Sequence, residues 1–155
     1  MSLESDIRLL QTSPFFAALQ PEALRLIAFA AETRNFRPGE SLFRQGDVAD
    51  GGYVVVSGEV TLQDGEGATK SDKTVGSGAL IGELALLIPS TRPVTAVAQG
   101  TASAIKISRA LFLRALEESP ASARRLLTEM TRNLVAYSSD MRKVQHALAD
   151  TNFGD

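Results

Sequence analysis

The spacing of apolar residues divides the chain into three regions, of which the first is helical. Between Pro21 and Glu32 the apolar residues recur at i, i+3, i+4 and i+7, which predicts an amphipathic helix. The residues with this spacing are Leu24, Ile27, Ala28 and Ala31. A shorter helical turn is expected over Glu4 to Leu10, with Pro14-Phe15-Phe16 as an apolar plug between the two. We therefore assign residues 1–33 to N-terminal helices.

The pattern changes over residues 34–107 to short apolar runs separated by turns that contain glycine, such as Asp50-Gly51-Gly52. The strand-like runs are Tyr53–Val56, Val60–Leu62, Val94–Ala98 and Ala102–Ile107. Many short strands with a turn after each indicate an antiparallel β-roll or jelly roll rather than a βαβ sheet. The polar stretch from Gln63 to Lys73 is expected to be a solvated loop at the tip of a hairpin.

Helical spacing returns over residues 108–148. Ser108 is expected to cap a helix through Leu116, and Ser119-Pro120 to end that helix and begin the next. In the last helix apolar residues alternate spacings of 3 and 4, which we call the heptad seam. It comprises Ala123, Leu127, Met130, Leu134, Tyr137, Met141, Val144 and Leu148. The seam favours a homodimer of two such helices; the alternative is a helix that only covers the β core.

Composition limits the function. A chain of 155 residues is expected to form a single domain, residues 1–155. There is no Cys and only one His, His146, so we expect no disulfide and no metal site. With 16 Lys and Arg against 18 Asp and Glu, the chain alone lacks the positive charge that drives DNA binding. No apolar run is long enough to span a membrane, and the N-terminus is not a secretory signal, so a cytoplasmic protein is expected.

Catalysis has little support in the sequence. His146 stands near the C-terminus, and no pair of carboxylates has a spacing that separates acid and base roles. There is no Walker-type loop, and no G-x-G-x-x-G sequence follows a strand. We therefore expect a protein that is not an enzyme.

The segment 81–95, which we call the cassette, carries the most chemical information. A Gly at position 82 permits a tight turn, after which Leu84 to Leu87 can begin a short helix whose first N–H groups suit an anion. Glu83 offers acceptors for a sugar hydroxyl, and Arg92 offers a charged fork for phosphate oxygens. On spacing alone, an ordinary turn with a surface arginine is the better explanation, because G-E-L is a short and common string.

The cassette resembles the phosphate-binding cassette of the cyclic nucleotide-binding domain family, F-G-E-L-A-L followed by R-A-A-T. That family includes the regulatory subunit of cyclic-AMP-dependent protein kinase and the bacterial catabolite activator proteins. Residues 37–47 resemble the family's P-G-E-x-I-F-x-x-G-D strand and turn, and residues 53–60 resemble its Y-x-V-x-x-G-x-V hairpin. The resemblance covers nearly the whole chain in order. It implies a mainly-β roll with flanking helices and a long C-terminal helix, with a cyclic nucleotide held inside the roll.

The resemblance also implies which residues bind the ligand, cAMP or cGMP. Backbone N–H groups of Gly82 and Ala85 would face the phosphate, and Arg92 would pair with its exocyclic oxygens. Glu83 would bind the ribose 2′-hydroxyl. Leu84 and Leu86 would hold the shape of the cassette. The remaining expected ligand-binding positions are Thr95, at the end of the cassette, and Tyr137 and Ser138, near the base.

Two departures from the family pattern matter. Pro93 follows the arginine where the family has Ala or Ser, so one N–H donor to the phosphate is missing, a loss of about 1–3 kcal/mol. Only residues 149–155 follow the last helix, too few for the DNA-reading module of the activators. Two hypotheses follow: a sensor module that signals through its C-terminal helix to a downstream protein, or a dimeric interaction scaffold that binds no nucleotide.

Overall fold

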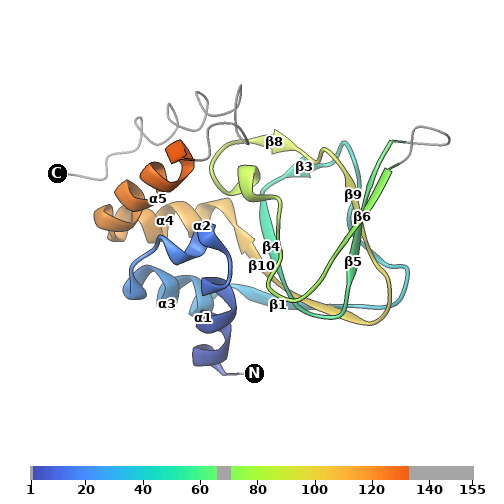
Figure 1. Ribbon diagram of the computed structural model, residues 1–155, viewed down its shortest axis with the longest axis horizontal. Coiled ribbons are helices and arrows are strands. Elements are labelled where there is room, and N and C mark those ends of the chain that lie inside the picture. Colours follow the sequence, from blue (N-terminus) through green and yellow to red (C-terminus); the bar gives the residue numbers. More distant parts are fainter. Residues whose placement is uncertain (1, 66–70, 133–155) are drawn as a thin grey trace.

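The computed structural model describes residues 2–65 and 71–132. The helices gather at one end of the molecule, and the strands form a roll at the other (Figure 1). The helices are α1 (Leu3–Gln11), α2 (Pro14–Ala17), α3 (Pro21–Ala30), α4 (Arg109–Glu118) and α5 (Pro120–Arg132), with the 3₁₀ helix η2 (Glu83–Leu86). The strands are β1 (Glu32–Phe36), β2 (Ser41–Phe43), β3 (Val48–Ala49), β4 (Gly51–Ser57), β5 (Val60–Asp64), β6 (Ser71–Val75), β7 (Leu80–Ile81), β8 (Ser90–Thr91), β9 (Thr95–Ala98) and β10 (Ala102–Ser108).

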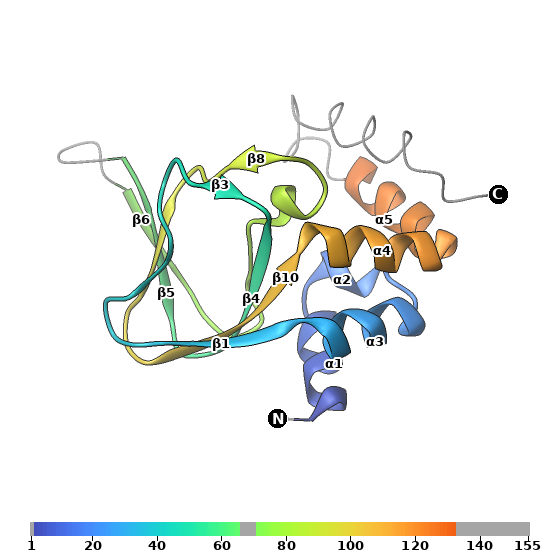
Figure 2. The ribbon, with the colours of Figure 1, turned by 180° about the vertical axis from the view of Figure 1, so that it is seen from behind.

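Every strand pair in the described part of the chain is antiparallel. One sheet has the order β1-β10-β4-β7, a second has the order β2-β9-β5-β6, and β3 pairs with β8. The strands β3 and β8 bridge the rim of the roll next to η2, a position that the view from behind also shows (Figure 2). The predicted fold class, a mainly-β antiparallel roll with flanking helices, is confirmed.

Strands β4 and β10 lie between two hydrophobic cores. On β4, Val54 packs into the helical core, whereas Tyr53 and Val55 pack inside the roll. On β10, Ile105 belongs to the helical core and Ala104 to the roll. Since successive side chains of a strand point to opposite faces, a strand between two cores needs apolar residues on both faces. This explains why β4 reads as an unbroken apolar run.

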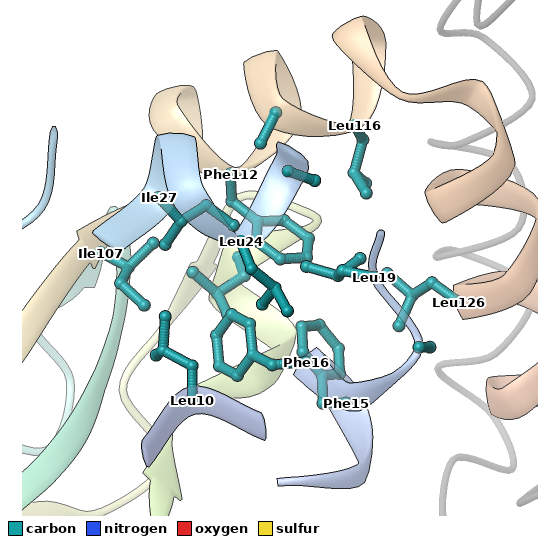
Figure 3. Close-up of a cluster of buried hydrophobic side chains, with 14 of the residues drawn as sticks. Leu10, Phe15, Phe16, Leu19, Leu24, Ile27, Ile107, Phe112, Leu116 and Leu126 are labelled. Carbon is teal, nitrogen blue, oxygen red and sulfur yellow. The ribbon is translucent and has the colours of Figure 1, made fainter. Parts of the chain in front are cut away.

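The helical core joins the N-terminal and C-terminal helices to the cassette. Phe15 stacks on Phe112 of α4 with ring centroids 5.3 Å apart, and Phe16 meets the same ring edge-on at 5.9 Å. Figure 3 shows these rings surrounded by aliphatic side chains from α1, α3, α4 and α5. Leu86 of η2 is fully buried in this core. The cassette is therefore anchored on the same side chains as the helices that follow the roll.

The predicted helix boundaries near the C-terminal end of the roll are confirmed. The Ser108 hydroxyl caps α4 by accepting a hydrogen bond from the Leu111 N–H at 3.1 Å. Ser119 ends α4, and Pro120 opens α5. The Ser122 hydroxyl, which is fully buried, accepts a hydrogen bond from the Gln20 N–H at 2.7 Å. This bond ties the first turn of α5 to the start of α3.

Two polar strands depart from the sequence expectation. The stretch Gln63 to Lys73 was expected to be a loop, but Ser71–Val75 forms β6, paired with β5 in the register Gln63↔Asp72. Glu32–Phe36 forms β1 with only Phe36 buried. Both are edge strands that pair on one side, so backbone pairing with a buried neighbour orders them without an apolar pattern of their own.

The described start of the heptad seam packs on its own domain. Ala123 and Met130 are buried in the helical core together with Leu126, and Leu127 packs against it. For these positions the covering helix is therefore the arrangement observed. Seam positions from Leu134 onward lie outside the described residues. Within residues 2–65 and 71–132, no helix is both long enough and apolar enough to cross a membrane.

Candidate functional site

The cassette begins with a glycine whose backbone no other residue adopts easily. Gly82 follows β7 and precedes η2 with a φ of +82°, in the left-handed region. A Cβ at this position would lie 2.5 Å from Nη1 of Arg92. Gly82 is thus required both by its dihedral angle and by the guanidinium that lies against its backbone.

The short helix η2 forms as the sequence predicts, one residue earlier and as a 3₁₀ turn. The Ala85 N–H donates to the Gly82 carbonyl at 3.2 Å, which closes this turn. In this conformation the Ala85 N–H is engaged within the turn, and its expected approach to a phosphate stays a prediction. The N–H groups of Glu83 and Leu84 stand in the first turn, where a helix supplies no acceptor of its own.

The backbone of Arg92 is fixed from both sides by the turn that joins β2 to β3. Its N–H donates to the Asp47 carbonyl at 2.8 Å, and its carbonyl accepts from the Gly46 N–H at 2.9 Å. The turn is itself closed by the Arg44 N–H, which donates to the Asp47 carboxylate at 3.0 Å. These bonds hold Arg92 at the rim of the roll next to β3 and β8.

The side chain of Arg92 turns into the roll rather than to solvent. The residue is 4% exposed, and neither Nε nor Nη1 has a hydrogen-bond partner among the described residues. Its guanidinium carbon lies 4.2 Å from the centroid of the Phe43 ring and 5.9 Å from that of Tyr53. The aromatic faces attract the cation but satisfy none of its N–H groups. The reading of Arg92 as a surface charge is therefore wrong.

Burial dominates the electrostatics of this pair. It lowers the pKa of the Arg92 guanidinium from its ordinary value, while Tyr53, Asp50 and Asp47 act in the opposite direction. Burial likewise raises the pKa of the Tyr53 phenol, against the influence of Arg34 and Arg92. A desolvated cation with unused donors is a site that an anion would stabilise.

Arg92 lines a cavity of about 400 Å³, within the usual size range of small-molecule sites. The lining residues come from β2, β3, β5, β7, the cassette and β8. They are Phe43, Ala49, Leu62, Leu80, Ile81, Gly82, Glu83, Leu84, Ala85, Ser90, Thr91, Arg92, Pro93 and Val94. Hollows of similar volume at the helical end are lined by other residues, and Arg92 is not among them.

The structure brings most of the predicted site residues together. Gly82, Glu83, Leu84, Ala85 and Arg92 all line the cavity. Leu86 is instead fully buried beneath it, as expected of a residue that holds the cassette in shape.

Thr95 differs from this group. Its hydroxyl accepts a hydrogen bond from the Gln45 N–H at 2.8 Å, and the residue is not part of the cavity lining. Thr95 thus fastens β9 to the turn that holds Arg92, and its expected role in ligand binding stays a prediction. Tyr137 and Ser138 lie outside the described residues.

The sequence does not reveal that the aromatic Phe43 and the hydroxyl-bearing Ser90 and Thr91 line the cavity. Phe43 was assigned only to a strand, and nothing in its spacing from Arg92 signals their contact. Ser90 and Thr91 form β8, where they pair with Ala49 and Val48. Polar residues flanked by Pro89 and Pro93 carry no strand signal, so only the fold places them at the cavity.

Comparison with known proteins agrees with this geometry. The family model described as the cyclic nucleotide-binding domain matches residues 33–119, which span the roll, the cassette and α4. The chain belongs to the cyclic nucleotide-binding domain family. The family's matched region contains Gly82, Glu83 and Arg92, so the site lies inside the shared domain.

Three similar proteins place this domain in different contexts. Lysophospholipase nte1 of Aspergillus oryzae is 30% identical over 146 residues, 91% of this chain but 10% of that enzyme. The cyclic AMP receptor protein of Thermus thermophilus is 31% identical over 124 residues, 79% of this chain and 57% of that protein. A cyclic nucleotide-binding-like protein of Brucella abortus has a TM-score of 0.67 at 43% identity, covering 73% of this chain and 98% of that one. The chain spans only part of these curated relatives, so their activities concern those proteins.

Proposed function

We propose that this domain is a regulatory module that binds a cyclic nucleotide, cAMP or cGMP, in the cavity beside η2. The observation that carries the proposal is Arg92, a 4% exposed guanidinium with two nitrogens that lack a hydrogen-bond partner. Leaving buried donors unpaired costs about 1–3 kcal/mol, and more for charged groups. A phosphate that accepts hydrogen bonds from these nitrogens removes this cost, which gives binding a strong driving force.

The rest of the cavity suits the other parts of such a ligand. The Glu83 carboxylate supplies acceptors for a ribose hydroxyl, and Ser90 and Thr91 add hydroxyl-bearing residues to the lining. Apolar side chains of Leu62, Leu80 and Val94 provide a surface for a flat, weakly polar base. The phosphate, the ribose hydroxyls and the base of a cyclic nucleotide would thus each meet a different set of residues in one cavity.

The names of similar proteins support the choice of ligand and a regulatory role. A cyclic AMP receptor protein and a cAMP-dependent protein kinase regulatory subunit are among them, so cAMP is the first ligand to test. The lysophospholipase match covers 10% of that enzyme, which relates this chain to one part of it. We therefore propose binding and regulation, not catalysis.

The proposed output is a change in the C-terminal helices. Leu86 of η2 shares the helical core with Phe112 of α4 and Leu126 of α5. Because this core is closely packed, a shift of the cassette would change the packing of both helices. We propose that residues beyond 132 continue as a helix, as the sequence predicts, and pair with those of a second chain through the seam positions from Leu134 onward. A downstream protein would then read the geometry of the dimer.

Thermal unfolding with added nucleotide tests the binding proposal. A ligand that binds only the folded state at 100 times its Kd stabilises it by about 2.7 kcal/mol. We expect cAMP or cGMP to raise the melting temperature of the wild type and to leave that of Arg92→Leu unchanged. No rise in the wild type at millimolar nucleotide, or an equal rise in both proteins, contradicts the proposal and favours the scaffold.

Light scattering after size-exclusion chromatography tests the dimer separately. The proposal expects a mass of two chains at tens of micromolar protein, and loss of that mass in Leu134→Asp. A control substitution, Thr128→Asp, stands on α5 outside the seam, and we expect it to leave the mass unchanged. A monomeric wild type contradicts the dimer without bearing on nucleotide binding.

A further inference from the structure

Arg109, the first residue of α4, links three segments that the proposed function does not yet connect. Its Nη1 donates to the carbonyls of Ala49 at 3.1 Å, Ala85 at 3.2 Å and Ile88 at 3.3 Å. Ala85 belongs to η2, Ile88 to the part of the cassette just after η2, and Ala49 to β3 at the cavity rim. One guanidinium nitrogen of Arg109 thus contacts η2, the residues just after η2, and β3 at the cavity rim.

This arginine stands at an unfavourable place in its own helix. The N-terminus of a helix carries a partial positive charge, so a cation in the first turn is destabilising, and α4 has no acidic residue there to offset it. Two of the carbonyls that Arg109 contacts, those of Ala85 and Ile88, lie instead at the C-terminal end of η2 and just beyond it, where a cation is favourable. The hydrogen bonds to the cassette carbonyls, and not the stability of α4, therefore account for an arginine at this position.

Close backbone packing brings the two elements together at this point. The Arg109 N–H donates to the Asp50 carbonyl at 2.6 Å. A Cβ on Gly51 would overlap the Ile107 carbonyl oxygen, and one on Gly52 would lie 2.9 Å from the Ile81 carbonyl oxygen. Because the two glycines have no side chains, two strand ends pack closely against β4: the end of β10, which leads into α4, and the end of β7, which leads into η2. The segment that leads into η2 and the segment that leads into α4 are thus separated only by β4.

We propose that Arg109 is the positioning residue that couples occupation of the cavity to the orientation of α4. The inference rests on the proposed function and deepens it, because it names the contact through which the cassette moves the C-terminal helices. When a ligand draws the cassette toward Arg92, the carbonyls of Ala85 and Ile88 shift, and Arg109 carries the start of α4 with them. Such coupling is reciprocal, so α4 also sets the affinity of the cavity.

Hydrogen exchange measured by mass spectrometry tests the coupling on the full chain, with and without saturating cAMP. Peptides that cover residues 83–88 report the cassette, and peptides that cover residues 109–118 report α4. In the wild type we expect cAMP to slow exchange in both. In Arg109→Gln the cassette response remains, and the α4 response falls by at least half.

The matched control is Arg114→Gln, on the same helix. Arg114 is exposed and pairs only with Glu118 at i+4 among the contacts described, so we expect both responses to equal those of the wild type. Arg109→Lys keeps the charge on a side chain one atom shorter and is expected to restore part of the α4 response. A general loss of stability would speed exchange even without ligand. It would not reduce the cAMP-induced change in α4 while leaving that in the cassette intact.

The outcomes separate the two proposals. A cassette response with an undiminished α4 response in Arg109→Gln overturns the coupling role alone. No cassette response in the wild type overturns the proposed function, and the coupling role with it. If Arg109→Gln does not fold, the same comparison is made with Arg109→Lys, in which an undiminished α4 response likewise overturns the coupling role.

Discussion

The guanidinium carbon of Arg92 lies 4.2 Å from the centroid of the Phe43 ring. Phe43 ends β2, and Arg92 follows β8, so the contact joins the two sides of the cavity rim. A cation over a desolvated aromatic face gains about 2 kcal/mol, which offsets part of the cost of burying the charge. The ring thus keeps a charged donor inside the roll while leaving Nε and Nη1 unpaired.

Replacing Arg92 by Met should separate stability from binding. Replacing buried charged groups by apolar residues of similar volume is often neutral or stabilising, and two nitrogens of Arg92 have no partner to lose, so the unfolding free energy without ligand should not fall. Nucleotide binding should weaken by at least about 100-fold, because hydrogen bonds to charged groups contribute about 1.5–3 kcal/mol each. Denaturant unfolding and a binding titration check the two halves.

Arg44→Met is the control for that change. Arg44 lies in the adjacent turn with an exposed side chain, so the substitution removes a positive charge near the cavity without removing a buried donor. We expect less than a threefold change in Kd. An equal loss of affinity in both variants would indicate that net charge, and not the Arg92 contact, governs binding.

Gly82→Ala should disturb the site beyond its backbone cost. A positive φ costs a residue with a Cβ about 1–2 kcal/mol, and here the Cβ would also meet Nη1 of Arg92 at 2.5 Å. Because the guanidinium has to move, we expect nucleotide affinity to fall by at least about tenfold, or about 1.4 kcal/mol. Titration of the variant with cAMP measures this loss.

Gly39→Ala provides a matched comparison. Gly39 has the same φ of +82°, but a Cβ there meets nothing within 4 Å. We expect a similar backbone cost in the unfolding free energy and an unchanged Kd. Loss of affinity in Gly39→Ala as well would show that strain alone, without the Arg92 contact, accounts for the effect.

Pro93→Ala should strengthen nucleotide binding. The proline lines the cavity directly after Arg92 but has no N–H to donate. Restoring one donor to the phosphate should lower Kd by about 5- to 150-fold, the equivalent of about 1–3 kcal/mol. Pro89→Ala removes an exposed proline from the same segment and controls for the added freedom of the unfolded chain. Equal affinities of Pro93→Ala and the wild type would exclude this role for the missing donor.

The stability of the fold should decline at alkaline pH because of Tyr53. Its folded-state pKa is raised above the ordinary 10.0 by burial, so the folded state holds the phenol proton more tightly than the unfolded state. The contribution is fully present below pH 10 and is lost as pH rises through the raised pKa. Denaturant unfolding at several pH values should show a shallower alkaline decline in Tyr53→Phe. The same slope in both proteins would contradict the assignment.

The sequence predicts those strands of the roll that lie between two cores and those helices that have explicit caps. Residues 53–56 are apolar on both faces because β4 separates the helical core from the roll, and Ser108 marks the start of α4 by its hydroxyl. The strands β1 and β6 escape prediction because their order comes from pairing with β10 and β5. Only the backbone of a neighbour, not a local pattern, specifies such strands.

The residues of the site likewise fall into those that the sequence predicts and those that only the fold reveals. Gly82, Glu83 and Arg92 are recognisable because the cassette is one continuous segment. The contact of Arg92 with Phe43 and the hydrogen bond from the Gln45 N–H to the Thr95 hydroxyl join residues far apart in the chain, so no spacing reveals them. Arg109 gives a weak local signal, a cation at the start of a helix, but its partners become visible only in the folded chain.

Calorimetric titration of cAMP into the wild type and Arg92→Met, side by side, tests the central claim most directly. The account predicts saturable heat with one nucleotide per chain in the wild type and none, or binding at least about 100-fold weaker, in the variant. Absence of heat in the wild type with both cAMP and cGMP at millimolar concentration, or equal affinity of the two proteins, would contradict it.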